Sequence, residues 1–309
     1  IHKCPFGAIG SRTHIVDVIE ALKSDKLVYA ILAPSTEGQF GTDITMRSWR
    51  NAMRLVGFTN FIEAGLGGDM TAAAEAAEWA EAYKEGKKMT TSCCPAFVNM
   101  IKQHFPTLLD NMSTTVSPMC AVSRMVKEKD PGTITVFIGP CIAKKSEAGQ
   151  DQEHPGENAD LVLTFEEFDA MLRAKEITLE PCAFEENQNG SIHAKNFSNS
   201  GGVTKAVKQA LMEQGVHAGV NVRQCNGAAE CRKALMLLKV GKLPEDFIEG
   251  MSCEGGCVAG TGNIVDEMSF KKERIKQLKK AGIMEIYIVV GFLKEKYEYL
   301  IDKYGVELV

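Results

Sequence analysis

Short apolar stretches rich in β-branched residues recur along the chain, and between them apolar positions return with a helical period. The apolar runs predict strands at residues 27–32, 58–64, 133–138 and 160–164. The amphipathic runs predict helices at residues 13–24, 43–56, 96–104, 117–129, 165–174, 203–214 and 228–240. Alternating strands and helices favour an α/β architecture with mostly parallel strands. We expect two lobes of such sheet, flanked by helices, with a metal site between them.

Turn-forming residues predict where regular structure stops. Residues 65–68 (Gly-Leu-Gly-Gly) predict a break, and Asp69 is the predicted N-cap of an Ala- and Glu-rich helix that ends near residue 84. The segment 187–202 is rich in Asn, Ser and Gly and predicts a long loop. Lysine-rich helical stretches are expected from the last cysteine to the C-terminus.

The charge balance disfavours two classes of partner. The formal net charge is -5, and no basic stripe is present that would neutralise the phosphates of a nucleic acid. No apolar run approaches the roughly 20 residues that a membrane-spanning helix needs. The N-terminal residues do not resemble a signal peptide. We therefore expect a cytoplasmic protein that binds neither nucleic acid nor membrane.

The chain has ten cysteines, and two uses of them compete. A disulfide framework is typical of short, loop-rich secreted proteins. This chain is long and regular, and its cysteines stand beside glycine and proline turns, so metal binding is the favoured interpretation. Four cysteines lack a metal-binding pattern and are interpreted as small buried hydrophobic residues: Cys120, Cys182, Cys225 and Cys231.

Three cysteine stretches support the metal hypothesis: residues 91–95, 139–147 and 249–257. The first contains adjacent cysteines, which point in different directions, so one thiolate can hold a metal while its neighbour stays free for chemistry. Four ligand thiolates with a fifth thiol beside them match an iron–sulfur cubane and a reactive cysteine. Structural zinc is the alternative. Zinc favours paired C-x-x-C spacings, whereas the spacing here differs in every stretch.

Together these stretches resemble the three signature motifs of the FeFe hydrogenase catalytic domain, and the resemblance covers the chain from about residue 26. The first motif, residues 91–95, is intact. The second motif keeps Pro140, Cys141, Lys144 and Glu147. The third motif keeps Glu249, Met251, Cys253, Gly256 and Cys257. Three motifs in the expected order make the resemblance specific.

The resemblance implies a six-iron active centre called the H-cluster. It implies a 4Fe–4S cubane held by Cys94, Cys141, Cys253 and Cys257. Cys257 would also bridge to a two-iron subsite that bears CO, cyanide and an azadithiolate. Four further residues match cofactor-binding positions: Pro34, Ser35, Lys144 and Met251. A lysine ammonium beside an anionic cyanide is a charge-assisted contact, and the alternative for Lys144 is a solvated surface lysine.

The resemblance also implies a proton relay that runs from Cys93 through Glu75 and Ser113 to Glu78. The two glutamates are three residues apart on a predicted helix and therefore share one face. Without the resemblance, such a pair is interpreted as a solvated acidic stripe. A buried Glu75 would suit the relay best, because burial favours the protonated carboxyl.

Several pocket positions depart from the family pattern. Gly139 stands where well-studied members have Met, Met119 replaces a Gln, and Phe97 replaces a Trp. The sequence Gly260-Thr261-Gly262 interrupts a usual glycine triplet. These changes surround the two-iron position and leave the four cysteines untouched. They indicate a divergent subgroup of the family.

The first residues are similar to the end of a bacterial ferredoxin motif, in which the last cysteine precedes a proline, as Cys4 precedes Pro5. We expect residues 1–12 to be the tail of a truncated ferredoxin-like module and residues 13–309 to be the hydrogenase domain. An accessory 4Fe–4S cluster would then use Cys4 and residues upstream of it. The alternative is an ordinary turn cysteine.

The expected activity is reversible H2 oxidation and proton reduction. The expected partners are H2 and protons, a ferredoxin or another low-potential electron carrier, and the maturation enzymes that make the two-iron subsite. Two alternatives stay open, namely an H2 or redox sensor domain with slow turnover and a non-catalytic iron–sulfur assembly protein. The assembly proteins lack the double cysteine, so Cys93-Cys94 favours the enzyme.

Overall fold

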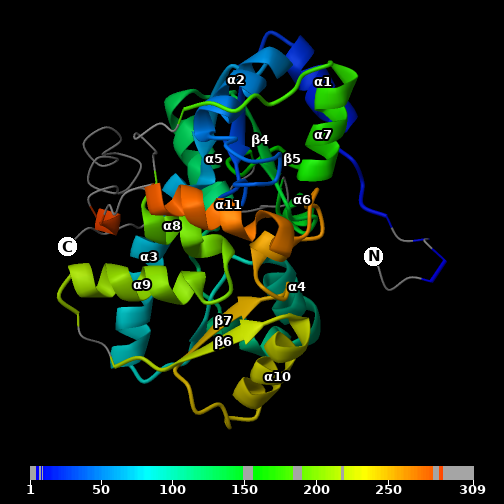
Figure 1. Ribbon diagram of the computed structural model, residues 1–309. Helices are drawn as coiled ribbons and strands as arrows, with labels where there is room; N and C mark the ends of the chain where they lie inside the picture. Colours follow the sequence, from blue (N-terminus) through cyan, green and yellow to red (C-terminus); the bar gives the residue numbers. More distant parts are fainter. Residues whose placement is uncertain are drawn as a thin grey trace.

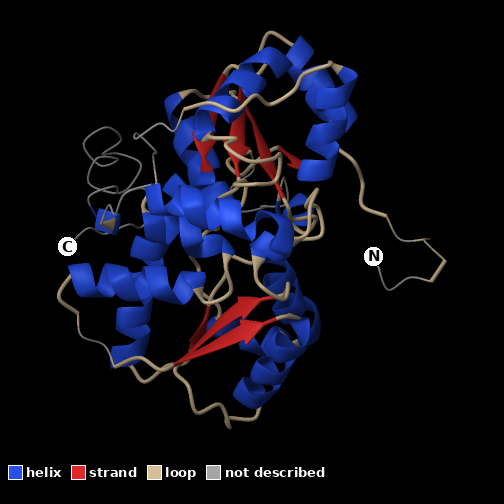
Figure 2. Cartoon of the chain, in the orientation of Figure 1, coloured by secondary structure: helices blue, strands red, loops and turns tan. Residues whose placement is uncertain are grey.

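The computed structural model describes residues 5–6, 8, 10–148, 156–183, 190–216, 219–280 and 285–287. Its strands form two separate parallel sheets, one in each lobe of the molecule (Figure 1, Figure 2). Helices surround both sheets, which confirms the expected α/β architecture. Within these ranges, no helix combines the length and the apolar character needed to cross a membrane.

The first lobe is built on a four-stranded sheet with the order β2-β1-β4-β5. Its strands are β1 (Val28–Leu32), β2 (Asn60–Glu63), β4 (Ile134–Gly139) and β5 (Leu161–Thr164). The flanking helices are α1 (Ile15–Lys23), α2 (Met46–Val56), α5 (Pro118–Lys129) and α7 (Phe165–Ala174). In the register of the sheet, Ala30 of β1 lies level with Phe61 and with Val136. The central strands β1 and β4 are buried almost throughout, and for this reason both have continuous apolar sequences.

The second lobe contains a three-stranded sheet with the order β3-β7-β6. Its strands are β3 (Met89–Thr90), β6 (Val222–Asn226) and β7 (Phe247–Met251). Helices of this lobe are α4 (Pro95–His104), α9 (Gly202–Glu213) and α10 (Ala228–Lys239). The apolar pattern does not predict β6 or β7, because β6 is mostly polar and β7 contains a glutamate and a glycine. A separate apolar core fills this lobe, with Phe97, Ile101 and Leu235 among its members.

The long helix α3 (Ala64–Lys84) packs against α5 of the first lobe and α9 of the second. The expected break at residues 65–68 is therefore wrong. The glycines at this position allow close packing, since a Cβ atom at Gly67 would lie only 2.2 Å from the carbonyl oxygen of Pro118. Glycine costs helix propensity, but that local cost is outweighed by the tertiary contact.

Asp69 is likewise not the N-cap of α3, because it lies inside the helix and is fully buried. Its carboxylate accepts hydrogen bonds from the backbone N–H of Ser191, at 2.8 Å, and from the Ser191 hydroxyl, at 2.5 Å. Ser191 caps the short helix α8 (Ile192–Lys195). Asp69 therefore fixes the start of α8 against the long helix.

The predicted loop at 187–202 contains α8 and the 3-10 turn η2 (Asn196–Ser198), so the expectation of a long loop is wrong in its described part. Three other short elements are η1 (Pro106–Asn111), α6 (Lys144–Glu147) and η3 (Cys257–Ala259). The lysine-rich segment forms α11 (Glu267–Lys280), which runs between the two sheets in Figure 1. Cys4 and residues 288–309 lie outside the described residues.

Candidate metal centre

The carboxyl ends of both sheets open into one cavity of about 490 Å³. The segments that follow β1, β3, β4 and β7 line it, and they are residues 33–35, 93–96, 140–144 and 251–253. Loops from neighbouring parallel strands meet at this edge of a sheet, which makes it the usual position for a site. Because segments from both sheets line it, the cavity lies between the lobes.

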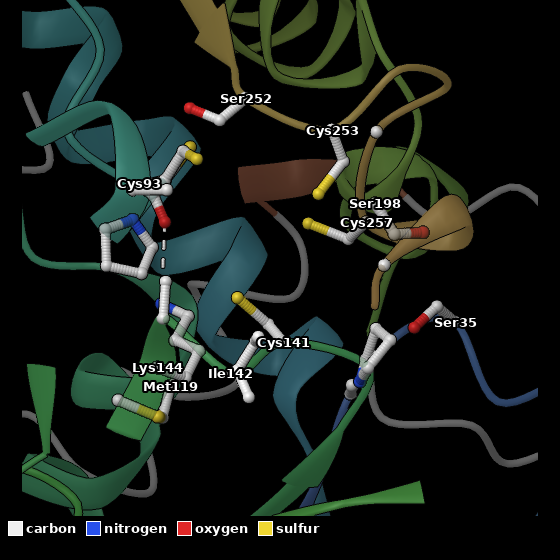
Figure 3. A pocket seen from close by; sticks show the side chains of 18 of the residues that line it. Ser35, Cys93, Met119, Cys141, Ile142, Lys144, Ser198, Ser252, Cys253 and Cys257 are labelled. Atoms are coloured by element: carbon white, nitrogen blue, oxygen red, sulfur yellow. Dashed lines mark hydrogen bonds between the residues drawn. The ribbon is translucent and has the colours of Figure 1, made fainter. Parts of the chain in front are cut away.

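The four cysteines of the predicted ligand set all line this cavity: Cys94, Cys141, Cys253 and Cys257. Figure 3 shows the sulfur atoms of Cys141, Cys253 and Cys257 pointing into the same space. All nine cysteines in the described part of the chain are free thiols. In the same part, no three His, Cys, Asp or Glu side chains are arranged to hold a single metal ion. The four thiols instead border different walls of a larger volume.

Burial determines the acid–base chemistry of these thiols. Burial raises the pKa of Cys141 to about 12, and it also raises the pKa of Cys253 and of Cys257. Neighbouring thiols raise all three pKa values further. Positively charged iron reverses this preference, because ligation deprotonates a coordinating thiol. The donor set and the shape of the cavity therefore fit an iron–sulfur cluster.

The loop that carries Cys253 and Cys257 depends on a glycine between them. Gly256 has a φ angle of +93°, in the region that favours glycine, and a Cβ atom there would lie 2.5 Å from the carbonyl oxygen of Ser198. Gly256 also forms an antiparallel bridge with Asn199. The close approach brings η2 to the same wall of the cavity as the cysteine loop.

Lys144 is buried and lines the cavity, so it is not a solvated surface lysine. Its ammonium forms a 2.6 Å ion pair with Glu147 and donates a 3.4 Å hydrogen bond to the carbonyl of Cys93 (Figure 3). Burial acts to lower the pKa of Lys144, but Glu147 and nearby thiols outweigh burial, so the pKa is raised. A fixed positive charge therefore lies at the cavity beside the double cysteine.

Pro34, Ser35 and Met251 also line the cavity. Ser35 has no exposed surface, and its hydroxyl oxygen has no hydrogen-bond partner among the described residues. A buried hydroxyl without a partner is costly, so the position favours a polar or anionic ligand that would satisfy it. The carbonyl of Pro34, in contrast, accepts a 2.9 Å hydrogen bond from the Ser198 hydroxyl.

The first two relay residues predicted from the resemblance are both buried. Cys93 lines the cavity and is 9% exposed, whereas Glu75 has no exposed surface. Burial raises the pKa of Glu75 well above its ordinary value, and Glu78 and Glu249 raise it further. Neither carboxyl oxygen of Glu75 has a hydrogen-bond partner in the described part of the chain. For Glu75, the alternative of a solvated acidic stripe is therefore excluded.

Ser113 joins this group to the half-buried Glu78. The Ser113 hydroxyl donates a 2.5 Å hydrogen bond to the Glu78 carboxylate, and the backbone N–H of Thr114 donates to the same carboxylate at 3.2 Å. Ser113 also acts to lower the pKa of Glu75, which places its hydroxyl near that carboxyl. The group therefore extends from the cavity to a carboxylate that solvent reaches.

At two of the positions that depart from the family pattern, Gly139 and Phe97, the surrounding space is tightly filled. A Cβ atom at Gly139 would lie 2.7 Å from Cε1 of Phe137, whose ring lines the cavity. Phe97 packs directly on Gly250, where a Cβ atom would lie 2.2 Å from the Phe97 ring. The buried Met119 also lines the cavity. Of these residues, Met119 and Phe137 border the cavity directly, whereas Phe97 belongs to the apolar core of the second lobe.

Sequence reasoning missed three residues that shape the site. Phe197 and Ser198 line the cavity, but they lie in the segment that composition predicted to be a loop. Glu249 belongs to the third motif, yet its contacts are structural. It accepts hydrogen bonds from the backbone N–H groups of Gly201, at 2.9 Å, and Thr204, at 3.0 Å, at the start of α9. Glu249 was named only as a motif residue, and no sequence signal marks its contacts at the start of α9. No motif marks the other two.

Comparison with known proteins gives a consistent picture. The family described as iron only hydrogenase large subunit, C-terminal domain, matches residues 26–261. Iron hydrogenase 1 of Clostridium pasteurianum is 27% identical in an alignment of 331 positions, which covers 89% of this chain and 57% of that protein. The chain thus spans a little more than half the length of this relative.

More distant relatives include a different kind of protein. A probable cytosolic Fe-S cluster assembly factor of Brugia malayi is 23% identical over 222 residues, or 56% of this chain and 48% of that protein. A solved structure of an FeFe-hydrogenase variant from Chlamydomonas reinhardtii has the same fold, with a TM-score of 0.75 at 20% identity, covering 93% of this chain and 95% of that one. Since the family match covers most of the chain and all three cysteine stretches, the chain belongs to the iron-only hydrogenase large-subunit family.

Proposed function

We propose that this chain is the catalytic domain of an FeFe hydrogenase and catalyses reversible H2 oxidation and proton reduction. The observation that carries the proposal is the pair Cys93-Cys94. Cys94 belongs to the set of thiols around the cavity, and Cys93 presents a buried thiol to the same cavity. Burial raises the pKa of the Cys93 thiol well above its ordinary value, and the nearby carboxyl of Glu75 raises it further. A cluster site and a proton acceptor thus occupy one place.

The proposed cofactor is an H-cluster, whose 4Fe–4S cubane would be held by Cys94, Cys141, Cys253 and Cys257. Cys257 would also hold the two-iron subsite with its CO, cyanide and azadithiolate ligands. When bound, the cluster supplies the redox chemistry of H2. Ser35 and Lys144 would donate hydrogen bonds to its anionic ligands, and the unsatisfied Ser35 hydroxyl supports this role. Pro34 and Met251, which line the same cavity, would help to exclude water from it.

We further propose that protons leave the cavity through Cys93, Glu75, Ser113 and Glu78, in that order. Cys93, as a neutral thiol, would donate its S–H proton through an ordered water to Glu75 while its sulfur accepts a proton from the cavity. The raised pKa of Glu75 supports this step, because burial favours the protonated carboxyl, which can donate one proton as it accepts another. The hydrogen bond between Ser113 and Glu78 supports the last transfer before solvent.

The proposed partners follow from this activity. Electrons would be exchanged with a ferredoxin or another low-potential carrier, and separate maturation enzymes would supply the two-iron subsite. The accessory 4Fe–4S cluster proposed for Cys4 falls outside the described residues. A cytoplasmic location is also proposed, and the cytosolic assembly factors among the relatives support it.

Two other functions each have an observation in their favour. A non-catalytic role in iron–sulfur assembly is favoured by the similarity to assembly factors. An H2 or redox sensor with slow turnover is favoured by the altered pocket residues Gly139 and Met119. The double cysteine and the buried carboxyl beside it favour the enzyme over both.

Infrared spectroscopy combined with gas analysis tests the proposal. The protein would be matured with the two-iron subsite, and its CO and cyanide bands and its H2 evolution from a strong reductant would be measured. The enzyme predicts intense bands together with rapid H2 evolution. Bands without appreciable gas would favour the sensor. A protein that binds cubane iron but never shows the bands would favour the assembly role and overturn the proposal.

A further inference from the structure

The helix α11 is fastened to the segment between β1 and α2, residues 33–45, which we name the 33–45 loop. Its contacts with that loop are hydrogen bonds from Gln277 to the carbonyl of Ile44 (3.1 Å) and from the backbone N–H of Asp43 to Glu273 (3.0 Å), and the packing of Phe270 on Gly38. The packing is tight, since a Cβ atom at Gly38 would lie 2.6 Å from the Cβ atom of Phe270. The first residues of this loop line the cavity.

Arg274 is the residue of α11 that reaches the cavity walls. Its Nη1 donates to the Glu37 carboxylate and, at 2.9 Å, to the carbonyl of Pro34. Its Nη2 donates to the carbonyl of Lys195, at 2.8 Å, and to the hydroxyl of Ser198, at 2.9 Å. One guanidinium thus joins the 33–45 loop to the segment of α8 and η2, which lies far from it in the sequence.

Both segments contribute to one wall of the cavity. Pro34 and Ser35 line it from the 33–45 loop, and Phe197 and Ser198 line it from η2. Figure 3 shows Ser35 and Ser198 on the same side of the cavity as Cys257. The Ser198 hydroxyl also donates a 2.9 Å hydrogen bond to the carbonyl of Pro34, so the two segments touch directly where Arg274 holds them.

The chemistry of this contact requires an arginine. Arg274 and Glu37 are each only 5% exposed, and the carboxylate compensates the buried guanidinium. A planar guanidinium directs several N–H donors at once, so it can serve acceptors on two segments, whereas a lysine ammonium is a compact point charge on a flexible stem. A lysine at this position would keep the charge but lose part of the bridge.

We propose that Arg274 is a positioning residue of the active site, which clamps Pro34–Ser35 against Phe197–Ser198. The clamp fixes the wall that the two-iron subsite would contact, and it holds the unsatisfied Ser35 hydroxyl at the cavity. The expected effect on the cofactor rests on the proposed function. The clamp itself is already present in the protein without cofactor. Arg274 lies beyond the range 26–261 that matches the family.

A matched control is available on the same helix. Lys276 is 44% exposed and pairs with Asp43 of the 33–45 loop at 2.5 Å, but it does not line the cavity. Lys276→Met therefore weakens the attachment of α11 to the loop without removing the bridge between the walls. Arg274→Met removes the bridge, and Arg274→Lys tests it in a variant that keeps the buried positive charge.

Hydrogen exchange of the protein without the two-iron subsite tests the clamp. In Arg274→Met, and to a smaller degree in Arg274→Lys, exchange of the backbone amides in residues 35–37 and 197–199 should rise by about tenfold or more. Lys276→Met should leave residues 197–199 unchanged. Unchanged exchange of both segments in Arg274→Met, or an equal rise in Lys276→Met, would overturn the clamp. If Arg274→Met does not fold, the same criteria are applied to Arg274→Lys.

Infrared spectra of the matured proteins test the effect on the cofactor. Arg274→Met and Arg274→Lys should shift or split the CO and cyanide bands, while Lys276→Met should keep the parent spectrum. Parent-like bands in both Arg274 variants would refute the role of the clamp at the cofactor and leave the proposed function intact. A parent protein without any CO or cyanide bands would refute the proposed function instead, and the exchange experiment would still decide on the clamp.

Discussion

The Ser113 hydroxyl donates a 2.5 Å hydrogen bond to the Glu78 carboxylate, next to the fully buried carboxyl of Glu75. The backbone N–H of Ser113 donates a 2.9 Å hydrogen bond to the carbonyl of Thr90, so β3 fixes the position of this hydroxyl. The same strand leads into the cysteine pair. One short strand therefore places both the thiol at the cavity and the hydroxyl that donates to Glu78.

Removing either inner member of the relay should slow turnover without altering the cofactor. Cys93→Ala and Glu75→Ala should each lower H2 production by about 10²- to 10⁴-fold, because a positioned proton donor contributes rate enhancement of that size. The infrared bands should stay close to those of the parent. Assays of H2 evolution, paired with infrared spectra of the same samples, make the measurement.

The matched control for the relay is Glu81→Ala, since Glu81 lies on α3 as Glu75 does but has an exposed side chain. It should retain parent activity. If Cys93→Ala or Glu75→Ala also kept nearly full activity, protons would leave by another route. If Glu81→Ala lost as much activity as Glu75→Ala, the effect would belong to the helix and not to the relay.

Phe137 and Gly139 should be energetically coupled, because the Phe137 ring occupies the space that a side chain at Gly139 needs. Gly139→Met should lower the free energy of unfolding by about 1–3 kcal/mol through overpacking. Phe137→Ala should cost about 3–5 kcal/mol by leaving a void. In the double variant the methionine can enter the void, so the combined loss should be smaller than the sum of the single losses.

Urea unfolding of the parent, the two single variants and the double variant measures this coupling. Strictly additive losses would contradict the coupling, because they would mean that the Phe137 ring and a methionine at position 139 do not compete for one space. Ala33 sets a limit on the rescue, since a Cβ atom at Gly139 would also lie 2.7 Å from the Ala33 Cβ. The coupling should therefore relieve only part of the strain.

Patterns in the sequence predicted the buried strands of the first sheet, because β1 and β4 are continuous apolar runs with turns after them. The pattern failed where tertiary contacts override local preference. The glycines at the start of α3 suggested a break, but Gly67 is a point of contact with the carbonyl of Pro118. In a sequence, glycines that allow close packing of a helix look the same as glycines that interrupt it. The two cases can be told apart only when the partner helix is known.

The site was predictable only as far as its motifs extend. The resemblance to the three family motifs pointed to four cysteines, and all four line the cavity. Ser198 and Arg274 carry no motif, and their roles depend on contacts between segments that are distant in the sequence, such as the 2.9 Å hydrogen bond between their side chains. Long-range hydrogen bonds of this kind leave no periodic pattern.

Asp69 should make the stability of the protein fall as pH rises toward neutrality. Burial raises the pKa of this carboxyl from 3.8 to about 7, in spite of its hydrogen bonds from Ser191. Between about pH 4 and pH 7 the unfolded chain has released a proton that the folded chain retains, so rising pH favours unfolding. The shift corresponds to a loss of roughly 4 kcal/mol across this window.

Asp69→Asn removes this titration. As pH rises, the free energy of unfolding of the variant should therefore increase relative to that of the parent. Urea unfolding of both proteins at several pH values from about 4.5 to 8 gives the difference. Asp110→Asn, at an exposed aspartate of η1, is the control and should follow the parent. A difference between Asp69→Asn and the parent that did not change with pH would contradict the prediction.

Replacing any of the four proposed ligand cysteines by alanine should lower the iron that the protein retains, whereas Cys182→Ala should not. Cys182 does not line the cavity, and its sulfur accepts a 3.9 Å hydrogen bond from Asn51. Protein reconstituted without maturation enzymes should hold about four iron atoms, because each ligand thiolate holds one iron of the cubane. Cys94→Ala, Cys141→Ala, Cys253→Ala and Cys257→Ala should each lose iron.

Iron binds only the folded state and therefore stabilises it, so a chelator should lower the unfolding temperature of the parent and of Cys182→Ala but leave the four other variants nearly unchanged. Full iron retention by any of the four would remove that cysteine from the ligand set.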